Sequence, residues 1–140
     1  MHTTVLQVRT GDRQQVVDLS GRCAGWLRDI GAADGLLNVF VPHATAGLVV
    51  LETGAGSDED LLAALAAVLP ASGPGGAGWR HVHGSPGHGR DHVLPGLVPP
   101  YATLPVLGGS IAFGTWQSIC LVDTNIDNPV RSVRLSFVAG

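Results

Sequence analysis

The sequence predicts a single domain of the α+β class, in which short helices are combined with mainly antiparallel strands. Its 140 residues are about the length of one ordinary domain. Two segments, 20–30 and 57–69, carry apolar residues at helical spacing. Beyond residue 100, short apolar runs alternate with turn-forming residues, which is typical of antiparallel strands. We therefore expect one domain over residues 1–140, without internal repeats.

Eight strands are predicted from runs of apolar residues bounded by turn signals. They are expected at residues 4–9, 14–19, 36–41, 47–52, 103–107, 110–113, 116–122 and 130–138. The turn at Gly11-Asp12 predicts that the first two form a hairpin, and the last four read as an antiparallel meander. In the last strand, apolar Val133, Leu135 and Phe137 alternate with polar residues, so one of its faces should meet solvent.

The two helices have recognisable start signals. Ser20 is in position to cap the first helix, and Gly31 is placed to end it. Ser57 precedes three acidic residues, which favour the positive end of a helix dipole. The second helix is followed by a long loop at residues 71–91 that is rich in Gly, Pro, Ser and His. A loop of this length inside a compact domain is usually functional or disordered.

Composition narrows the classes of function. All eight basic residues are arginines, so a lysine Schiff base and a P-loop lysine are excluded. The arginines are scattered and the net charge is −3, which argues against a nucleic-acid partner. The chain has no apolar run long enough to span a bilayer and no basic, apolar leader at its start, so we expect a cytoplasmic protein with no membrane partner. Cys23 and Cys120 lie in apolar runs and are expected to be buried, reduced thiols.

The long loop concentrates the residues that are most capable of chemistry. Four of the six histidines lie within it or at its end: His81, His83, His88 and His92. Imidazole is the commonest metal ligand and titrates nearest to neutral pH, so the cluster admits a metal site or acid–base catalysis. The spacing alone does not separate these functions from a set of surface histidines.

Other candidates stand outside this loop. His43 lies at the polar corner between two strands, beside small residues that leave room for a cavity, although a buried histidine bonded to a backbone carbonyl would give the same pattern. Glu52 ends an apolar strand, where a carboxylate must be exposed, paired or bound to a metal. Trp116 can stack on a flat ligand or join the core. Arg131 can bind a phosphate or keep an edge strand soluble.

Three segments carry a family resemblance. They are Pro42 to Leu48 with Glu52 downstream, Trp79-Arg80-His81 followed by a glycine-rich run to His92, and Leu104-Pro105-Val106 through Gly109 to Gly114-Thr115-Trp116-Gln117. In this order they resemble the YjbQ-like family, over about residues 5–138. The resemblance implies an α+β fold of two packed, mainly antiparallel sheets with two or three short helices, assembled as a homotrimer. The small charged fraction, 14%, agrees with subunit contacts.

The resemblance also implies a site. A divalent ion, zinc or magnesium, would be held by His43, His81 and His92, with His88 as a further candidate. The candidates for acid–base catalysis are His43, Glu52 and His88. The candidates for binding a small phosphorylated substrate are Thr45, Thr115, Trp116, Gln117 and Arg131. The chain departs from the family pattern at Leu51, where asparagine is common, and over residues 85–91.

Two functions follow from the resemblance and the histidines. Some members resemble thiamine-phosphate synthases, which join a pyrimidine diphosphate to a thiazole phosphate and release diphosphate. In that reading the metal and Arg90 or Arg131 would neutralise the leaving diphosphate. The alternative is a non-catalytic trimer that binds a metal or a small ligand.

Overall fold

The computed structural model describes residues 1–140, and its strands form two antiparallel sheets. The larger sheet has the order β1 (His2–Arg9), β8 (Val130–Ala139), β3 (Gly35–Phe40), β5 (Tyr101–Leu107) and β6 (Ser110–Ile111). The smaller sheet has the order β2 (Gln15–Asp18), β7 (Ser118–Asp123) and β4 (Ala46–Leu51). The predicted α+β class and the two antiparallel sheets are therefore confirmed.

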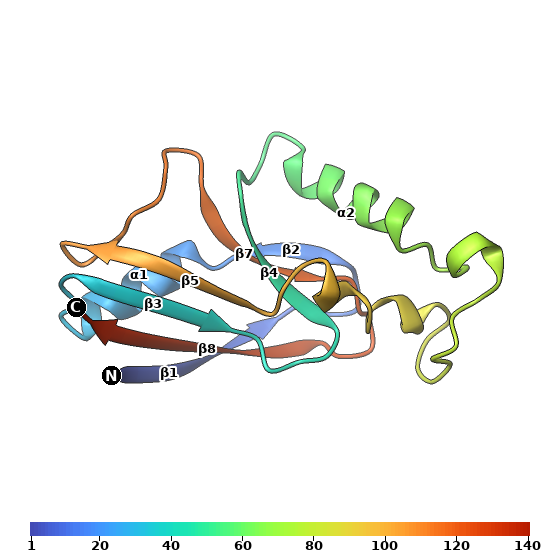
Figure 1. The fold of residues 1–140 in the computed structure, drawn as a ribbon, viewed down its shortest axis with the longest axis horizontal. Helices are drawn as coiled ribbons and strands as arrows, with labels where there is room; N and C mark the ends of the chain where they lie inside the picture. Colours follow the sequence, from blue (N-terminus) through green and yellow to red (C-terminus); the bar gives the residue numbers. More distant parts are fainter.

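The molecule is built in layers, with α2 (Ser57–Val68) over the smaller sheet (Figure 1). The main apolar core lies between the two sheets and includes Leu27 of α1 (Ser20–Asp29), Leu121 of β7 and Leu135 of β8. A second apolar cluster joins Leu65 of α2 to Val122 on the other face of β7. Burial of these side chains from water is the main force that holds the layers together.

Two predictions of strand pairing are wrong. β1 pairs with β8 in the larger sheet and β2 pairs with β7 in the smaller one, so the first two strands do not form a hairpin. The last four strands are not a meander, because β7 leaves the larger sheet and β8 returns between β1 and β3. Strands that are neighbours in sequence usually pair, but here β1 and β2 belong to different sheets. The hydrophobic pattern reports a strand's buried face and not its partner.

The helix boundaries are close to those predicted, but the two serine caps are not formed. Ser20 and Ser57 are the first helical residues, and neither helix has a side-chain cap at its start. The Ser20 hydroxyl instead accepts a hydrogen bond from the Ile119 N–H at 3.0 Å, which ties α1 to β7. The glycine predicted to end α1, Gly31, has the left-handed φ of 62° that favours glycine after a helix.

The strand β8 is central and not at an edge, and this changes the expectation for Arg131. Arg131 shares the buried face of β8 with Val133 and Leu135, while Arg134 is exposed on the other face. The predicted one-sided exposure of this strand is confirmed. Cys23 and Cys120 are free and buried, as expected, and burial raises the pKa of each thiol to about 12. Neither α-helix has the length and apolar content needed to cross a bilayer.

Candidate metal centre

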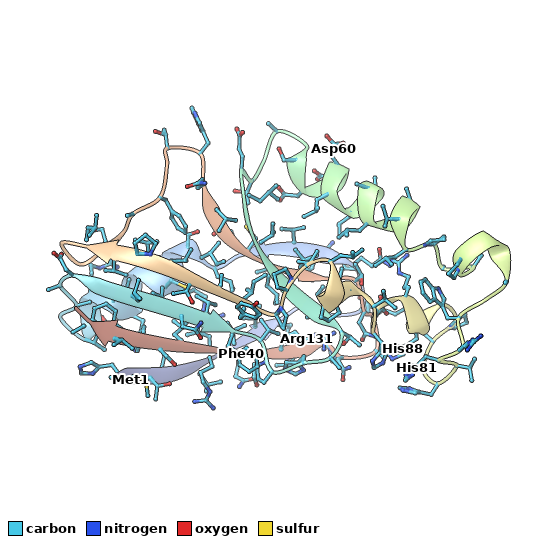
Figure 2. The ribbon with its side chains drawn as sticks, in the orientation of Figure 1. Met1, Phe40, Asp60, His81, His88 and Arg131 are labelled. Atoms are coloured by element: carbon cyan, nitrogen blue, oxygen red, sulfur yellow. The ribbon has the colours of Figure 1, made fainter.

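Four imidazoles gather at the end of the molecule where β8 begins, and Figure 2 shows His81 and His88 there. The four residues are His81, His83, His88 and His92. One ring nitrogen of each lies within 4.8 Å of the others. The Nε2 atoms of His88 and His92 are 2.9 Å apart, and those of His81 and His83 also face each other. The sequence-predicted ligands His81 and His92 are thus brought together, along with His83 and His88.

The local chain path explains this convergence. His88 opens a short 3-10 turn, η2 (His88–Arg90), which turns the chain so that the His92 ring faces the His88 ring. The segment carrying His81 packs directly against this turn at Gly89. A Cβ at Gly89 would lie 2.6 Å from the His81 carbonyl oxygen and against the Trp79 side chain, which real structures do not tolerate. The approach of the two segments therefore requires glycine at this position.

His88 has a carboxylate partner. Its Nδ1 lies 2.7 Å from Oδ2 of Asp127, which also accepts hydrogen bonds from the backbone N–H and hydroxyl of Ser85, both at 3.1 Å. Asn125 Nδ2 is 2.8 Å from the same Nδ1, and its two hydrogens allow it to donate to this nitrogen as well as to Asp91. The Asp127 carboxylate favours the tautomer with the proton on Nδ1, in which the lone pair of His88 Nε2 is free to bind a cation. Metal-binding histidines commonly have such a carboxylate partner.

A buried hydrogen-bond network fastens the histidine loop to the β7–β8 connection. The Thr124 hydroxyl donates to Asp91 Oδ1 at 2.6 Å, and Asn125 Nδ2 donates to Asp91 Oδ2 at 3.2 Å. At the other end of the loop, Trp79 Nε1 donates to the Pro70 carbonyl at 2.9 Å. The loop of residues 71–91 is thus anchored at both ends, which supports the functional reading of its length.

Desolvation and the neighbouring imidazoles lower the pKa of two of the clustered histidines. The pKa values of His81 and His92 lie below the usual value of 6.5, because of the desolvation of their rings and the nearby imidazoles, His83 and His88 among them. The pKa of the Asp127 carboxyl is lowered mainly by the hydrogen bond from the Ser85 backbone N–H. A neutral imidazole has a free lone pair, so these shifts favour the form of His81 and His92 that can bind a cation.

His43 lines a cavity beside the histidine cluster. This cavity, of about 270 Å³, is also lined by Thr45, His88, His92 and Arg131. His43 is not one of the four clustered histidines. Its Nε2 accepts a hydrogen bond from the Ser132 N–H at 3.0 Å, where β8 extends beyond the end of β3. The ring is therefore bonded to the backbone, but to an N–H group and not to the backbone carbonyl that was considered from the sequence. Burial and the neighbouring Arg131 lower the pKa of His43.

Arg131 is fully buried and paired. Its Nε and Nη2 bind the two carboxylate oxygens of Asp123 at 2.7 and 2.8 Å. Its Nη1 lies 3.4 Å from His43 Nδ1. Arg90 is also buried, and it donates to the Leu69 carbonyl at 3.4 Å and faces Asp91. Both arginines are therefore engaged within the fold, and only Arg131 lines the cavity beside His43.

The remaining predicted site residues lie elsewhere in the chain. Glu52 follows β4 and is exposed, outside the cavities that the clustered histidines line. The loop between β6 and β7 projects from the opposite end of the molecule (Figure 1). It carries Thr115, Trp116 and Gln117, and Trp116 is 71% exposed. Within one chain, the β6–β7 loop therefore lies apart from the clustered histidines.

Sequence reasoning missed the acidic and amide residues of the site. Residues 125–128 lie between the strands predicted at 116–122 and 130–138 and were given no part in the site, yet they supply Asn125 and Asp127 beside His88. A signal was present, since this turn has three Asn or Asp residues in a chain with few ionisable groups. The inward face of Arg131 also follows from its period-two spacing with Val133 and Leu135.

The donor set fits a transition-metal ion. Imidazole nitrogens bind zinc at about 2.0–2.1 Å, and four of them can surround one ion. Hard ions such as magnesium prefer oxygen ligands, and the four converging donors are all nitrogens. The residues present therefore suit zinc, copper, nickel or iron better than magnesium.

Fold and cluster together define a small α+β protein with an imidazole-rich candidate metal centre. Its family is established by sequence: the profile described as "UPF0047 protein YjbQ-like" matches residues 4–140, so the chain belongs to this family.

Relatives cover the whole chain. The UPF0047 protein Rv2556c of Mycobacterium tuberculosis is 55% identical over 140 residues, with all of both chains covered. A UPF0047 protein of Methanothermobacter thermautotrophicus is 31% identical and covers 100% of this chain and 93% of its own length. Among solved structures, the hypothetical protein APE1520 from Aeropyrum pernix K1 has a TM-score of 0.86, with 32% identity and full coverage of both chains. A "YbjQ-like protein of unknown function" from Sulfolobus solfataricus P2 has a TM-score of 0.89 at 23% identity, covers 99% of this chain and 97% of its own, and supports the fold alone.

Proposed function

We propose that this protein is a metal-dependent enzyme that acts on a small phosphorylated molecule. The proposed ligands of one divalent ion are His81, His83, His88 and His92. The observation that carries the proposal is the convergence of their ring nitrogens within 4.8 Å, together with the carboxylate that orients His88. This set replaces the one implied by the family resemblance: His43 is omitted because its Nε2 already accepts a backbone hydrogen bond.

The chemistry of such a site depends on an open position. An ion held there would act as a Lewis acid toward phosphate oxygens and would stabilise the charge of a leaving diphosphate. The protein's part is to orient the imidazoles, through Asp127 for His88, and to bind the substrate in the adjoining cavity of about 270 Å³. The reaction type implied by the resemblance is that of a thiamine-phosphate synthase.

The second candidate is a non-catalytic metal-binding or small-ligand-binding trimer. Four imidazoles can close a tetrahedral zinc site, and closed sites are usually structural. Catalysis requires five or more coordination positions or the release of one ligand. His81 and His83 are exposed and are the ligands with least packing to prevent such release. The coordination number of the bound ion therefore separates the two functions.

A homotrimer fits the surface of the larger sheet. On its outer face, Leu36 pairs with Val138 and Phe40 pairs with Tyr101, and all four are at least 38% exposed. Exposed apolar patches of this kind commonly mark subunit contacts. If the β6–β7 loop binds substrate, as the resemblance implies for Trp116, it must do so in a neighbouring subunit, because it projects away from the histidines of its own chain (Figure 1).

The proposal is tested by metal content and turnover. We expect the purified protein to retain about one transition-metal ion per chain, measured by inductively coupled plasma mass spectrometry. The double variant His81→Ala, His92→Ala should lose the ion, whereas His2→Ala should keep it, since His2 is an exposed histidine far from the cluster in sequence and on β1. Thiamine phosphate formation is then assayed with the metal-loaded and metal-stripped protein. Equal metal content in all variants contradicts the site, and metal binding without any turnover favours the second candidate.

A further inference from the structure

The first part of the histidine loop, residues 71–84, has few attachments to the rest of the protein. Every backbone hydrogen bond that it makes stays within it or returns to Pro70, where it begins, and residues 79–84 make none. The first hydrogen bond to another part of the fold is the one from Ser85 N–H to Asp127. In Figure 1 this part of the loop lies at the right-hand end of the molecule, beyond the sheets. We call residues 71–84 the strap.

Side-chain packing adds little to this attachment. Within the strap only Gly73 is buried and only Trp79 is partly buried, and Val82 is 85% exposed. Trp79 packs against the second apolar cluster, and its Nε1 donates back to Pro70. A segment with few buried apolar contacts and few hydrogen bonds opens at a small cost in free energy. The strap is such a segment.

The four clustered histidines are divided between the strap and a firmly held turn. His81 and His83 lie on the strap and are exposed, whereas His88 is buried in η2 and contacts Asp127. The ring centroids of His81 and His92 are 4.1 Å apart, and those of His83 and His88 are 4.9 Å apart. Each histidine of the strap thus lies against one histidine of the anchored part.

The backbone of the strap also comes close to this anchored part. At Gly84, with a φ of 82°, an added Cβ would lie 2.8 Å from Cγ of the His88 ring and 2.9 Å from Oδ2 of Asp127. Glycine is therefore required on both sides of the contact, at Gly84 in the strap and at Gly89 in the turn. The two segments are shaped to lie against each other, although no backbone hydrogen bond joins them.

We infer that metal binding closes the strap: an ion held by His81 and His83 together with His88 and His92 ties residues 71–84 to the anchored turn, and loss of the ion lets them open. The inference rests on the proposed function, because it takes the four histidines as ligands of one ion. A ligand shifts a conformational equilibrium by its difference in affinity for the two states. The closed state offers the ion four imidazoles, and the open state offers it only the two of the anchored part.

Closure of the strap also regulates the proposed substrate site. His83 and Gly84 belong to the wall of the cavity of about 270 Å³. On the other side of the cluster, Trp79 and His81 line a second cavity of about 430 Å³. Both cavities lose a wall when the strap opens. The ion therefore assembles the cavities as well as supplying charge, and it binds before the substrate.

Limited digestion with trypsin tests this inference, because Arg80 is the only trypsin site in the strap and is exposed. Cleavage after Arg80 gives fragments 1–80 and 81–140, which mass spectrometry identifies. Arg13, exposed in the turn between β1 and β2 and outside the strap, is the internal control. Cleavage rates are measured on the full chain, metal-free and zinc-loaded, with the zinc content determined in each sample.

We expect zinc to slow cleavage after Arg80 and to leave cleavage after Arg13 unchanged. With free zinc at about 100 times its dissociation constant, cleavage after Arg80 should be about 100-fold slower if opening releases the ion. A reduction of about 10-fold is the smallest that agrees with the inference. In the double variant His81→Ala, His83→Ala, zinc should give no protection, whereas His2→Ala should behave like the wild type. Each protein is compared with itself, with and without zinc, because His81 follows the cleaved bond.

The zinc content separates failure of the inference from failure of the proposed function. A wild type that holds zinc but is cleaved after Arg80 at the metal-free rate overturns the inference and leaves the proposed function standing. Resistance of Arg80 in the metal-free protein also overturns it, because the strap would then be closed without the ion. Equal protection at Arg13, or protection that persists in His81→Ala, His83→Ala, has the same consequence. A wild type that binds no zinc overturns the proposed function and the inference together.

Discussion

The link between Asp127 and His88 leads to a quantitative prediction for metal affinity. A single oxygen, Oδ2, accepts from His88 Nδ1 at 2.7 Å and from two groups of Ser85 at 3.1 Å. Asp127→Asn can keep an oxygen in this place and removes the charge, while Asp127→Ala removes the acceptor as well. Loss of such an outer partner weakens metal binding by about 10- to 100-fold. We expect the asparagine variant near the lower end of this range and the alanine variant near the upper end.

Competition with a chromogenic zinc chelator measures these affinities. The matched control is Asp34→Asn, because the Asp34 carboxylate also accepts a short backbone hydrogen bond, from Gly108 N–H at 2.7 Å, but at a turn outside the site. The control should bind zinc like the wild type. An unchanged zinc affinity in Asp127→Ala would refute the reasoning, since it would mean that His88 does not depend on its carboxylate or is not a ligand.

Three further predictions concern pH, packing and assembly. The folded-state pKa values of His81 and His92 lie below the usual 6.5, so the metal-free protein should lose stability as pH falls below about 6.5, which urea unfolding measures. Gly89→Ala should destabilise the protein by about 1–3 kcal/mol and weaken zinc binding, because the new Cβ would meet the carbonyl of His81. In Gly21→Ala, nothing lies near the new Cβ, and the helix should gain stability, by up to about 1 kcal/mol. Phe40→Asp, on the outer face of the larger sheet, should convert the expected trimer to monomers in light scattering.

Each of these three predictions has an outcome that would contradict it. A pH slope that persists in a variant with His81 and His92 replaced by glutamine would assign the effect to other groups. Equal stability changes in Gly89→Ala and Gly21→Ala would show that the approach of the histidine segments is not tight. A wild-type protein that is monomeric in solution would contradict the trimer and, with it, a role for Trp116 at a neighbour's site.

The sequence was sufficient to predict that histidines of the loop belong to one group, but not which histidines the group contains. Imidazoles concentrated between residues 81 and 92 can converge through local turns, so their proximity follows from spacing along the chain. His43 lies far away in sequence, and its ring direction depends on where β3 ends against β8. The position at which β3 ends against β8 is set only when the sheet is assembled. For this reason the proposed ligand set contains His83 in place of the predicted His43.

Strand positions were predictable for a similar reason, whereas strand partners were not. The alternation in β8 identifies its buried face, including Arg131, from local pattern alone. The pairing of β1 with β8 and of β2 with β7 joins segments more than 100 residues apart. Asp123 contacts Arg131 across the β7–β8 connection, and Asp127 contacts His88 in the histidine loop, so both roles depend on how separate segments meet. The sequence pattern near each of them is that of an ordinary strand end or turn.

X-ray absorption at the zinc edge of the zinc-loaded protein tests the central claim most directly. The account predicts a shell of imidazole nitrogens at about 2.0–2.1 Å that falls from four to two when His81 and His92 are replaced. If the ion gains a fifth ligand, an oxygen atom, when phosphate is added, the result would support the enzyme over the non-catalytic metal-binding protein. A shell made mainly of oxygen, or one unchanged by these substitutions, would contradict the convergence of the four histidines on a single ion.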